Sequence, residues 1–178
     1  MRTIHLFIAT SLDGFIAGPD GEIDWLSPFE SVDYGYNTFL ESIDTTLMGN
    51  TTYKEVLSFG DFPYKDKTNY VFTRNANLPE APYITYVTEE AVSFVRALKQ
   101  QDGKDIWLVG GGQLNSTLLA AELIDKISLF LIPITIGRGI PLFAPSTGRL
   151  NWMLQSSKAL DKGMMQLEYV KPTGELGQ

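Results

Sequence analysis

The chain contains no cysteine and only one histidine among its 178 residues. The absence of cysteine excludes disulfide bonds, thiolate metal sites and a cysteine nucleophile. A Ser-His-Asp triad would have to use His5, and so would most zinc sites. His5 lies within residues 3–9, an apolar stretch with the composition of a strand. We therefore expect His5 to have a structural or surface role rather than a catalytic one.

Basic residues and long apolar runs are also scarce. The chain has 14 Lys and Arg residues against 21 Asp and Glu residues, which gives a net charge of -7. A nucleic-acid partner needs a basic footprint, so we expect none. No basic segment followed by a long apolar run opens the chain, and no stretch approaches the roughly 20 apolar residues that span a bilayer. These features predict a cytoplasmic protein with no membrane partner.

Apolar runs and helical periodicities alternate along the chain. Strands are predicted at residues 3–9, 45–48, 69–73, 84–87, 105–109, 127–136, 152–156 and 164–170, and helices at 31–42, 51–57, 89–100 and through Leu114, Leu118 and Leu119. This order predicts a three-layer α/β/α fold with a mostly parallel central sheet and a C-terminal antiparallel hairpin. Residues 10–24 are predicted to form a long loop. We see no repeat or linker, so residues 1–178 are interpreted as one domain.

Three glycines separate one of the predicted strands from a helix, in the segment Gly110-Gly111-Gly112-Gln113. Each glycine costs about 1 kcal/mol of backbone entropy relative to alanine, and a simple turn needs one at most. Three glycines let a ligand approach the main chain at a helix N-terminus, where N–H groups bind anions. The alternative is a tight turn packed against its neighbours.

Two further junctions follow predicted strands. The first, Gly49-Asn50-Thr51-Thr52, places two hydroxyls where they can cap a helix or bind a phosphate. The second, Thr73-Arg74, places a guanidinium after a strand end, although an isolated arginine there is equally explained as a surface residue. Because open α/β sheets bind ligands at the carboxyl ends of their strands, the three junctions together predict a nucleotide site.

Several motifs resemble those of the dihydrofolate reductase-like superfamily. They are Ala9-Thr10-Ser11-Leu12-Asp13-Gly14-Phe15-Ile16-Ala17, Met48-Gly49-x-Thr51/Thr52-Tyr53, Val109-Gly110-Gly111-Gly112, and Pro133-x-x-x-Gly137-x-Gly139-x-Pro141-Leu142-Phe143. The chain is most similar to the branch that contains the reductase domain of the bifunctional riboflavin-pathway enzyme (RibD) and its stand-alone relatives. The resemblance extends from about Ile4 to Val170 and implies an NADPH-dependent enzyme that pairs as a homodimer.

The resemblance also implies roles for individual residues. Ala9 and Ile16 would form the walls of the nicotinamide slot, and the loop 13–24 would close over it. The pyrophosphate and the adenosine ribose would be held by Gly49, Asn50, Thr51 and Thr52 on one side and by Gly110, Gly111, Gly112, Gln113 and Leu114 on the other. Thr73 and Arg74 would bind the 2′-phosphate. Many relatives have arginine in place of Asn50, so one phosphate contact is weaker here.

The resemblance implies one acid in the substrate pocket. When the chain is aligned with the folate reductase pattern backward from Gly49 without a gap, this acid corresponds to Asp33. Tyr36 would follow one helical turn later as a further substrate residue. Trp25 would lie in the pocket wall or in the core. The alternative for Asp33 is a solvated acid in the first turn of a helix. Asp13 is a second candidate acid, which turn geometry explains more simply. The segment 137–139 is interpreted as a structural turn between strands. The alternative is that Arg138 contacts an anionic substrate.

The leading hypothesis is hydride transfer to a small pyrimidine or pterin heterocycle. The riboflavin precursor that carries a ribosylaminouracil is the first candidate, and dihydrofolate the second. Two rival hypotheses are a nucleotide-binding module without turnover and a flavodoxin-like electron carrier. The flavodoxin-like carrier would need a hydroxyl- and glycine-rich phosphate loop after the first strand, which residues 10–14 match poorly.

Overall fold

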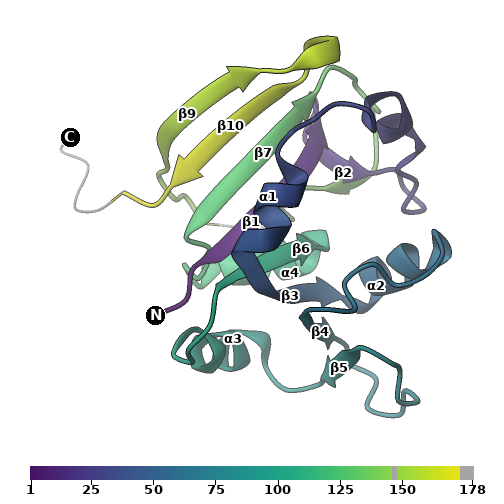
Figure 1. The fold of residues 1–178 in the computed structure, drawn as a ribbon, viewed down its shortest axis with the longest axis vertical. Helices are drawn as coiled ribbons and strands as arrows, with labels where there is room; N and C mark the ends of the chain where they lie inside the picture. Colours follow the sequence, from purple (N-terminus) through teal and green to yellow (C-terminus); the bar gives the residue numbers. More distant parts are fainter. Residues whose placement is uncertain (146–147, 173–178) are drawn as a thin grey trace.

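Eight strands form the central sheet, in the order β5-β4-β3-β6-β1-β7-β10-β9 (Figure 1). The computed structural model describes residues 1–145 and 148–172. The strands are β1 (Ile4–Ser11), β3 (Ile43–Gly49), β4 (Thr68–Phe72), β5 (Ile84–Val87), β6 (Asp105–Gly110), β7 (Lys126–Ile132), β9 (Met153–Ala159) and β10 (Met165–Val170). All pairs from β5 to β7 are parallel, and β10 pairs antiparallel with both β7 and β9. The predicted α/β fold with an antiparallel C-terminal hairpin is therefore confirmed.

The long apolar strand near the C-terminus is an interior strand. β7 is hydrogen-bonded to β1 on one side and to β10 on the other, and it ends at Ile132, directly before Pro133. A strand that is paired on both edges and covered on both faces is expected to be apolar throughout. Its place in the sheet accounts for the apolar composition of residues 127–132 without a subunit interface, while residues 133–136, also predicted as strand, lie beyond its end.

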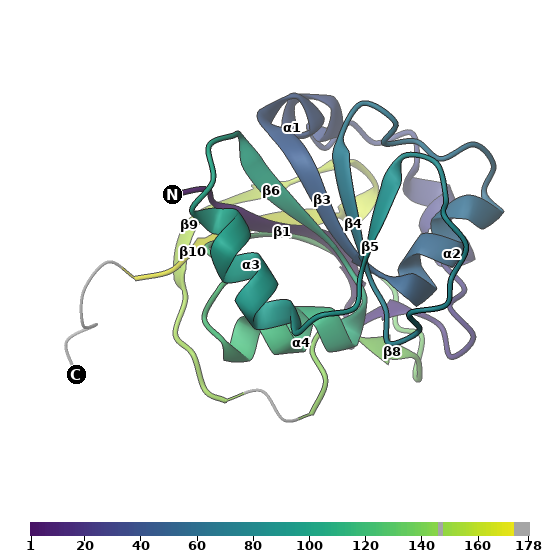
Figure 2. The same ribbon diagram turned by 90° about the horizontal axis from the view of Figure 1, so that it is seen from below.

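Helices cover both faces of the sheet. Figure 2 shows α3 (Ala91–Lys99) and α4 (Gly112–Ala120) on one face and α1 (Tyr36–Ser42) on the other, while α2 (Asn50–Ser58) lies near the ends of β3 and β4. The alternation of side chains along a strand assigns neighbours to opposite faces. In β1, Leu6 packs into the core beneath α3 and α4, whereas Phe7 packs into the core beneath α1.

The segment before α1 differs from the prediction. Residues 31–42 were expected to form one helix, but Asp24–Phe29 form a 3₁₀ helix (η1) and α1 begins only at Tyr36. Gly35 has a φ of 75°, which interrupts the helix at this point. Asp33 consequently lies in a loop, where its Oδ1 accepts a hydrogen bond of 3.0 Å from the Gly35 N–H.

The predicted loop 10–24 contains a short strand that the sequence did not indicate. β2 (Phe15–Ala17) pairs antiparallel with β8 (Ile140–Pro141) as a separate two-stranded sheet. This pairing attaches the loop after β1 to the segment after β7, two regions more than 120 residues apart in the chain. Within residues 1–145 and 148–172, no helix has the length and apolar character required to cross a membrane.

His5 is partly buried in β1, which agrees with the expected structural role. Its ring packs edge-on against Phe39 with 5.1 Å between centroids, and its Nε2 lies 2.6 Å from Ser128 Oγ. Burial is the main cause that lowers the pKa of His5 from 6.5 to about 4. Below pH 6.5 the unfolded chain therefore binds a proton that the folded chain does not, and stability decreases until the pH reaches about 4.

We expect the wild-type free energy of unfolding to fall by up to about 3 kcal/mol more than that of His5→Gln between pH 7 and pH 4. Urea unfolding at several pH values measures this difference. Equal pH dependence of the two proteins would show that His5 does not carry this proton linkage.

Candidate functional site

A groove of about 910 Å³ lies where the parallel strands β3, β4 and β6 end, and all three predicted junctions line it. Because the strands are parallel, their carboxyl ends meet at one edge of the sheet. Of the residues predicted to bind a cofactor, those that line the groove are Ala9, Ile16, Gly49, Asn50, Thr51, Thr52, Thr73, Arg74, Gly111, Gly112, Gln113 and Leu114. Gly110 does not line it and is the last residue of β6.

The two glycine junctions lie against each other. A Cβ added to Gly111 would lie 3.2 Å from Thr52 Oγ1 and 3.8 Å from the Gly49 nitrogen, and Gly111 has a φ of 106°. A Cβ on Gly112 would instead lie 2.6 Å from the Pro141 carbonyl oxygen. Gly111 therefore leaves open the narrow space between the junctions, while Gly112 allows close packing against β8. The interpretation as a site of ligand approach thus applies to Gly111, and the interpretation as a tightly packed turn applies to Gly112.

The two helices that begin at the groove have free N-terminal ends. α2 and α4 start without a side-chain capping hydrogen bond, whereas α3 is capped by Glu90, which accepts from the N–H groups of Val92 and Ser93. The expectation that threonine hydroxyls cap α2 is therefore wrong. Uncapped first-turn N–H groups bind anions, and two such ends along one groove suit the two charges of a pyrophosphate.

The groove carries one cation for an anionic ligand. Among the residues that the structure describes, Arg74 is the only Lys, Arg or His that lines it. Arg74 lies on the surface just after β4, and Thr73 Oγ1 accepts a hydrogen bond of 3.1 Å from the Asn75 N–H. The backbone N–H groups, the hydroxyls and this guanidinium are the donor types that hold a dinucleotide with an additional phosphate.

Asp13 connects the loop over the groove to the segment after β7. Its carboxylate accepts hydrogen bonds from the N–H groups of Gly137 (2.7 Å) and Ile136 (3.2 Å), and Ser11 Oγ donates to it at 2.6 Å. These hydrogen bonds, with that of Ser11 the largest, lower the pKa of Asp13. The geometry supports a structural role for Asp13. Arg138 is exposed in the adjoining turn and lines neither cavity of the site.

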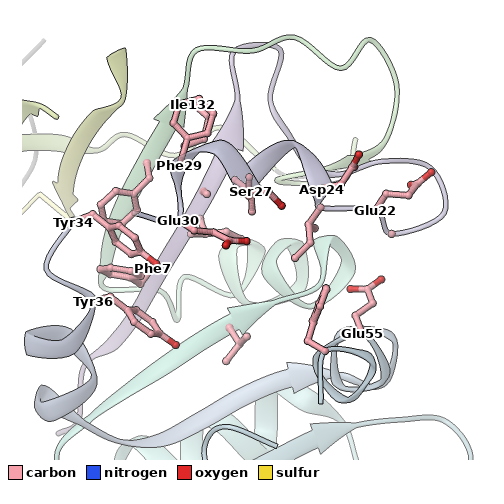
Figure 3. A pocket seen from close by; sticks show the side chains of 18 of the residues that line it. Phe7, Glu22, Asp24, Ser27, Phe29, Glu30, Tyr34, Tyr36, Glu55 and Ile132 are labelled. Carbon is pink, nitrogen blue, oxygen red and sulfur yellow. The ribbon is translucent and has the colours of Figure 1, made fainter. Parts of the chain in front are cut away.

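A second cavity of about 980 Å³ adjoins the groove and has aromatic walls (Figure 3). Its aromatic lining consists of Phe7, Phe29, Phe59, Tyr34, Tyr36, Tyr64, Trp107 and Phe130. Phe130 lies 4.6 Å from Phe7 and 5.2 Å from Tyr34 between ring centroids. Such a wall suits a flat apolar or heterocyclic ligand. Ile8, Ala9 and Val109 line both cavities, so the strands β1 and β6 provide a shared wall.

The predicted substrate residues are only partly brought together. Tyr36 lines the aromatic cavity, and burial, with the neighbouring Tyr64, raises the pKa of its hydroxyl, which stays protonated. Asp33 is exposed and does not line the cavity, so the structure does not bring this predicted acid into the pocket. Trp25 is buried but lines neither cavity, and it belongs to the core.

Several residues of the site were missed by the sequence analysis. Phe7 and Phe130 were interpreted as interior strand residues, and the acid that lines both cavities is Glu55, one turn after the threonines of α2. The spacing of Glu55 from Thr51 and Thr52 was a signal that could have identified it. Within residues 1–145 and 148–172 no group of three His, Cys, Asp or Glu side chains is arranged to hold a metal ion.

The sequence-family model of the RibD C-terminal domain matches residues 2–166 of the chain. The chain belongs to this family. Its fold is that of the dihydrofolate reductase-like superfamily, as the motifs suggested, and the flavodoxin-like alternative is therefore wrong.

Known proteins of this family and fold resemble the chain over most of its length. "Uncharacterized protein YwjB" of Bacillus subtilis is 40% identical over 172 residues, which cover 96% of this chain and 98% of that protein. A putative riboflavin biosynthesis protein from Shewanella sp. PV-4 has a TM-score of 0.84 and 30% identity, with 97% and 99% of the two chains covered. Dihydrofolate reductase from Enterococcus faecalis, complexed with NADP(H), has a TM-score of 0.67 and 17% identity, with 94% and 95% covered, and shows the shared fold.

We expect Asp13→Ala to release the loop over the groove without unfolding the sheet. The carboxylate is the acceptor for two backbone N–H groups of the segment after β7, and its removal leaves them without that partner. Hydrogen–deuterium exchange should become faster at residues 12–18 and 134–142 and stay unchanged in β3 and β6. Unchanged exchange in the loop would show that the β2–β8 pairing alone holds it.

Proposed function

We propose that the chain is an NADPH-dependent reductase of a small pyrimidine or pterin heterocycle. The observation that carries the proposal is the shared wall of Ile8, Ala9 and Val109, where a groove with dinucleotide-binding character opens beside an aromatic cavity. A reductase must hold cofactor and substrate in contact at such a wall. Membership of the RibD C-terminal domain family supports a reductase of this type.

The groove residues fit NADPH. The uncapped N-termini of α2 and α4, with the hydroxyls of Thr51 and Thr52, would hold the pyrophosphate. The open space at Gly111 would admit it between the two junctions, where a Cβ would be in the way. Arg74 would hold the 2′-phosphate and favour NADPH over NADH.

When bound, NADPH supplies the hydride. The protein's contribution is to position the substrate against Ile8, Ala9 and Val109 and to exclude water with the segment 20–30, which covers the cavity. The side chain of Asp33 lies outside the cavity, so a proton that the reaction consumes would come from water or from Glu55, which lines both cavities. A nucleotide-binding module without turnover is the second candidate, and it would bind NADPH but oxidise none with any heterocycle.

The first experiment is to titrate the purified protein with NADPH and NADH and then to screen aminouracils and pterins for NADPH oxidation. Binding of NADPH with turnover of a heterocycle supports the proposal. If neither dinucleotide binds, the reductase proposal fails. The same sample, measured by light scattering, tests the homodimer that the family resemblance implies.

We expect Arg74→Gln to raise the Kd for NADPH at least about tenfold and to leave the Kd for NADH unchanged. A guanidinium–phosphate hydrogen bond contributes roughly 1.5–3 kcal/mol to binding. NADH has no 2′-phosphate and so does not form this hydrogen bond. Calorimetric titration measures both constants. Arg138→Gln removes the same charge outside the groove and should bind both cofactors as the wild type does. Equal weakening of NADPH and NADH by Arg74→Gln would contradict the assignment.

We expect Asp33→Asn to change the rate of NADPH oxidation by less than about twofold. Its side chain is exposed and accepts only the Gly35 N–H among the described contacts, and the amide oxygen of asparagine retains that hydrogen bond. Steady-state kinetics with the substrate found in the screen measures the effect. A loss of kcat of a hundredfold or more would restore Asp33 as the acid.

A further inference from the structure

The charged residues that line the aromatic cavity are all acidic. They are Asp20, Glu22, Asp24, Glu30 and Glu55. Among the residues that the structure describes, no Lys, Arg or His lines this cavity. An aromatic cavity of about 980 Å³ accommodates a flat heterocycle, and the sign of its lining charges decides which heterocycles enter.

Two of these carboxylates lie at different parts of the cavity wall. Figure 3 shows Glu30, at the end of η1, extending into the hollow, and Glu55, on α2, pointing toward the loop that carries Glu22 and Asp24. Glu22 instead turns back to its own loop, where its Oε2 accepts a hydrogen bond of 2.9 Å from the Asp20 N–H. The Glu55 carboxylate lies against Gly21 of the covering loop. Glu55 thus stands at the boundary of the two cavities, both of which it lines.

A basic side chain held next to η1 does not line the cavity. Lys162, from the turn between β9 and β10, donates hydrogen bonds to the Pro28 carbonyl oxygen and, at 3.0 Å, to Ser31 Oγ. Its ammonium group is thus held on the outer side of η1. Arg74 lines the groove and not the aromatic cavity.

We propose that the substrate is a flat nitrogen heterocycle that carries a positive charge on its ring and no phosphate group. This inference rests on the proposed reductase function and narrows its substrate class. Aromatic faces and carboxylates together attract a ring cation. A ribose phosphate would have to enter beside these carboxylates, and no Lys, Arg or His of the described residues lines the cavity to receive it. We therefore expect the phosphorylated riboflavin precursor to be a poor substrate.

The charge also bears on the chemistry. Hydride addition to a carbon of a cationic ring forms one C–H bond, moves the π electron pair of the C=N⁺ unit to nitrogen and leaves a neutral product. Both electrons come from NADPH, which becomes NADP⁺, so no proton is consumed. Such a reaction needs no proton donor, so the carboxylates that line the cavity can remain ionised and attract the ring. Burial raises the pKa of Glu55, and a cation beside it favours its ionised form.

Three probes of similar size separate charge from shape: 1-methylquinolinium (cation), 2-methylquinoline (neutral) and quinoline-2-carboxylate (anion). Binding is measured at pH 8 with saturating NADP⁺, from the quenching of tryptophan fluorescence, because Trp107 lines the cavity. We expect the cation to bind at least tenfold more tightly than the neutral probe, and the anion more weakly than either. The preference should shrink in 1 M NaCl.

The double variant Glu30→Gln/Glu55→Gln should reduce the preference for the cation at least fivefold and leave the Kd of the neutral probe unchanged. Glu41→Gln/Glu80→Gln removes two exposed glutamates outside both cavities and should keep the wild-type preference. Equal binding of the three probes, or tighter binding of the anion, would overturn the proposal. So would a preference that both double variants retain.

The two proposals fail in different ways. If NADP⁺ binds and the probes show no charge preference, the substrate class is wrong and the reductase function stands. If NADP⁺ does not bind, the reductase function is wrong, and the same probe series without cofactor still decides the charge preference of the cavity. Oxidation of NADPH by 1-methylquinolinium with no proton uptake, followed in weakly buffered solution, supports both.

Discussion

The parallel pairing of β3 with β4 and β6 is the constraint on which the candidate site depends. It brings the three strand ends to one edge, so that Gly49, Gly111 and Arg74 line a single groove although they come from separate parts of the chain. β1, which pairs with β6, contributes Ile8 and Ala9, and these residues line both cavities together with Val109 of β6. Hydrogen bonding of the backbone thus fixes the position of the groove relative to the aromatic cavity.

The groove could be predicted from sequence because its determinants are local. A glycine, a hydroxyl or an arginine directly after an apolar strand keeps the same position relative to the strand end in any parallel sheet. The position of Asp33 could not be predicted in this way. Val32 and Phe39 have helical spacing and are both buried in one core, but a loop with Gly35 at a φ of 75° joins them. Tertiary packing produced a periodicity that resembled a continuous helix.

The aromatic cavity could not be predicted because its walls come from distant parts of the chain. Phe7 and Phe130 lie on neighbouring strands and their rings meet at 4.6 Å, but each looks like an ordinary core residue in its own strand. Only the assembled sheet shows that their face is incompletely covered by α1 and η1. The β2–β8 pair was missed for a related reason, since strands of two and three residues have no measurable periodicity.

The two cavities are lined by different kinds of structural element. The groove is formed largely by strand ends and helix starts of the core, whereas one continuous stretch, residues 20–36, supplies most of the cover of the aromatic cavity. Surface segments accept substitutions that a packed sheet does not. Changes confined to this stretch would alter which molecules enter the aromatic cavity, and only Ile23 and Leu26 of the stretch also line the groove. A chain built on this plan can change the shape and charge of one cavity while the other stays nearly constant.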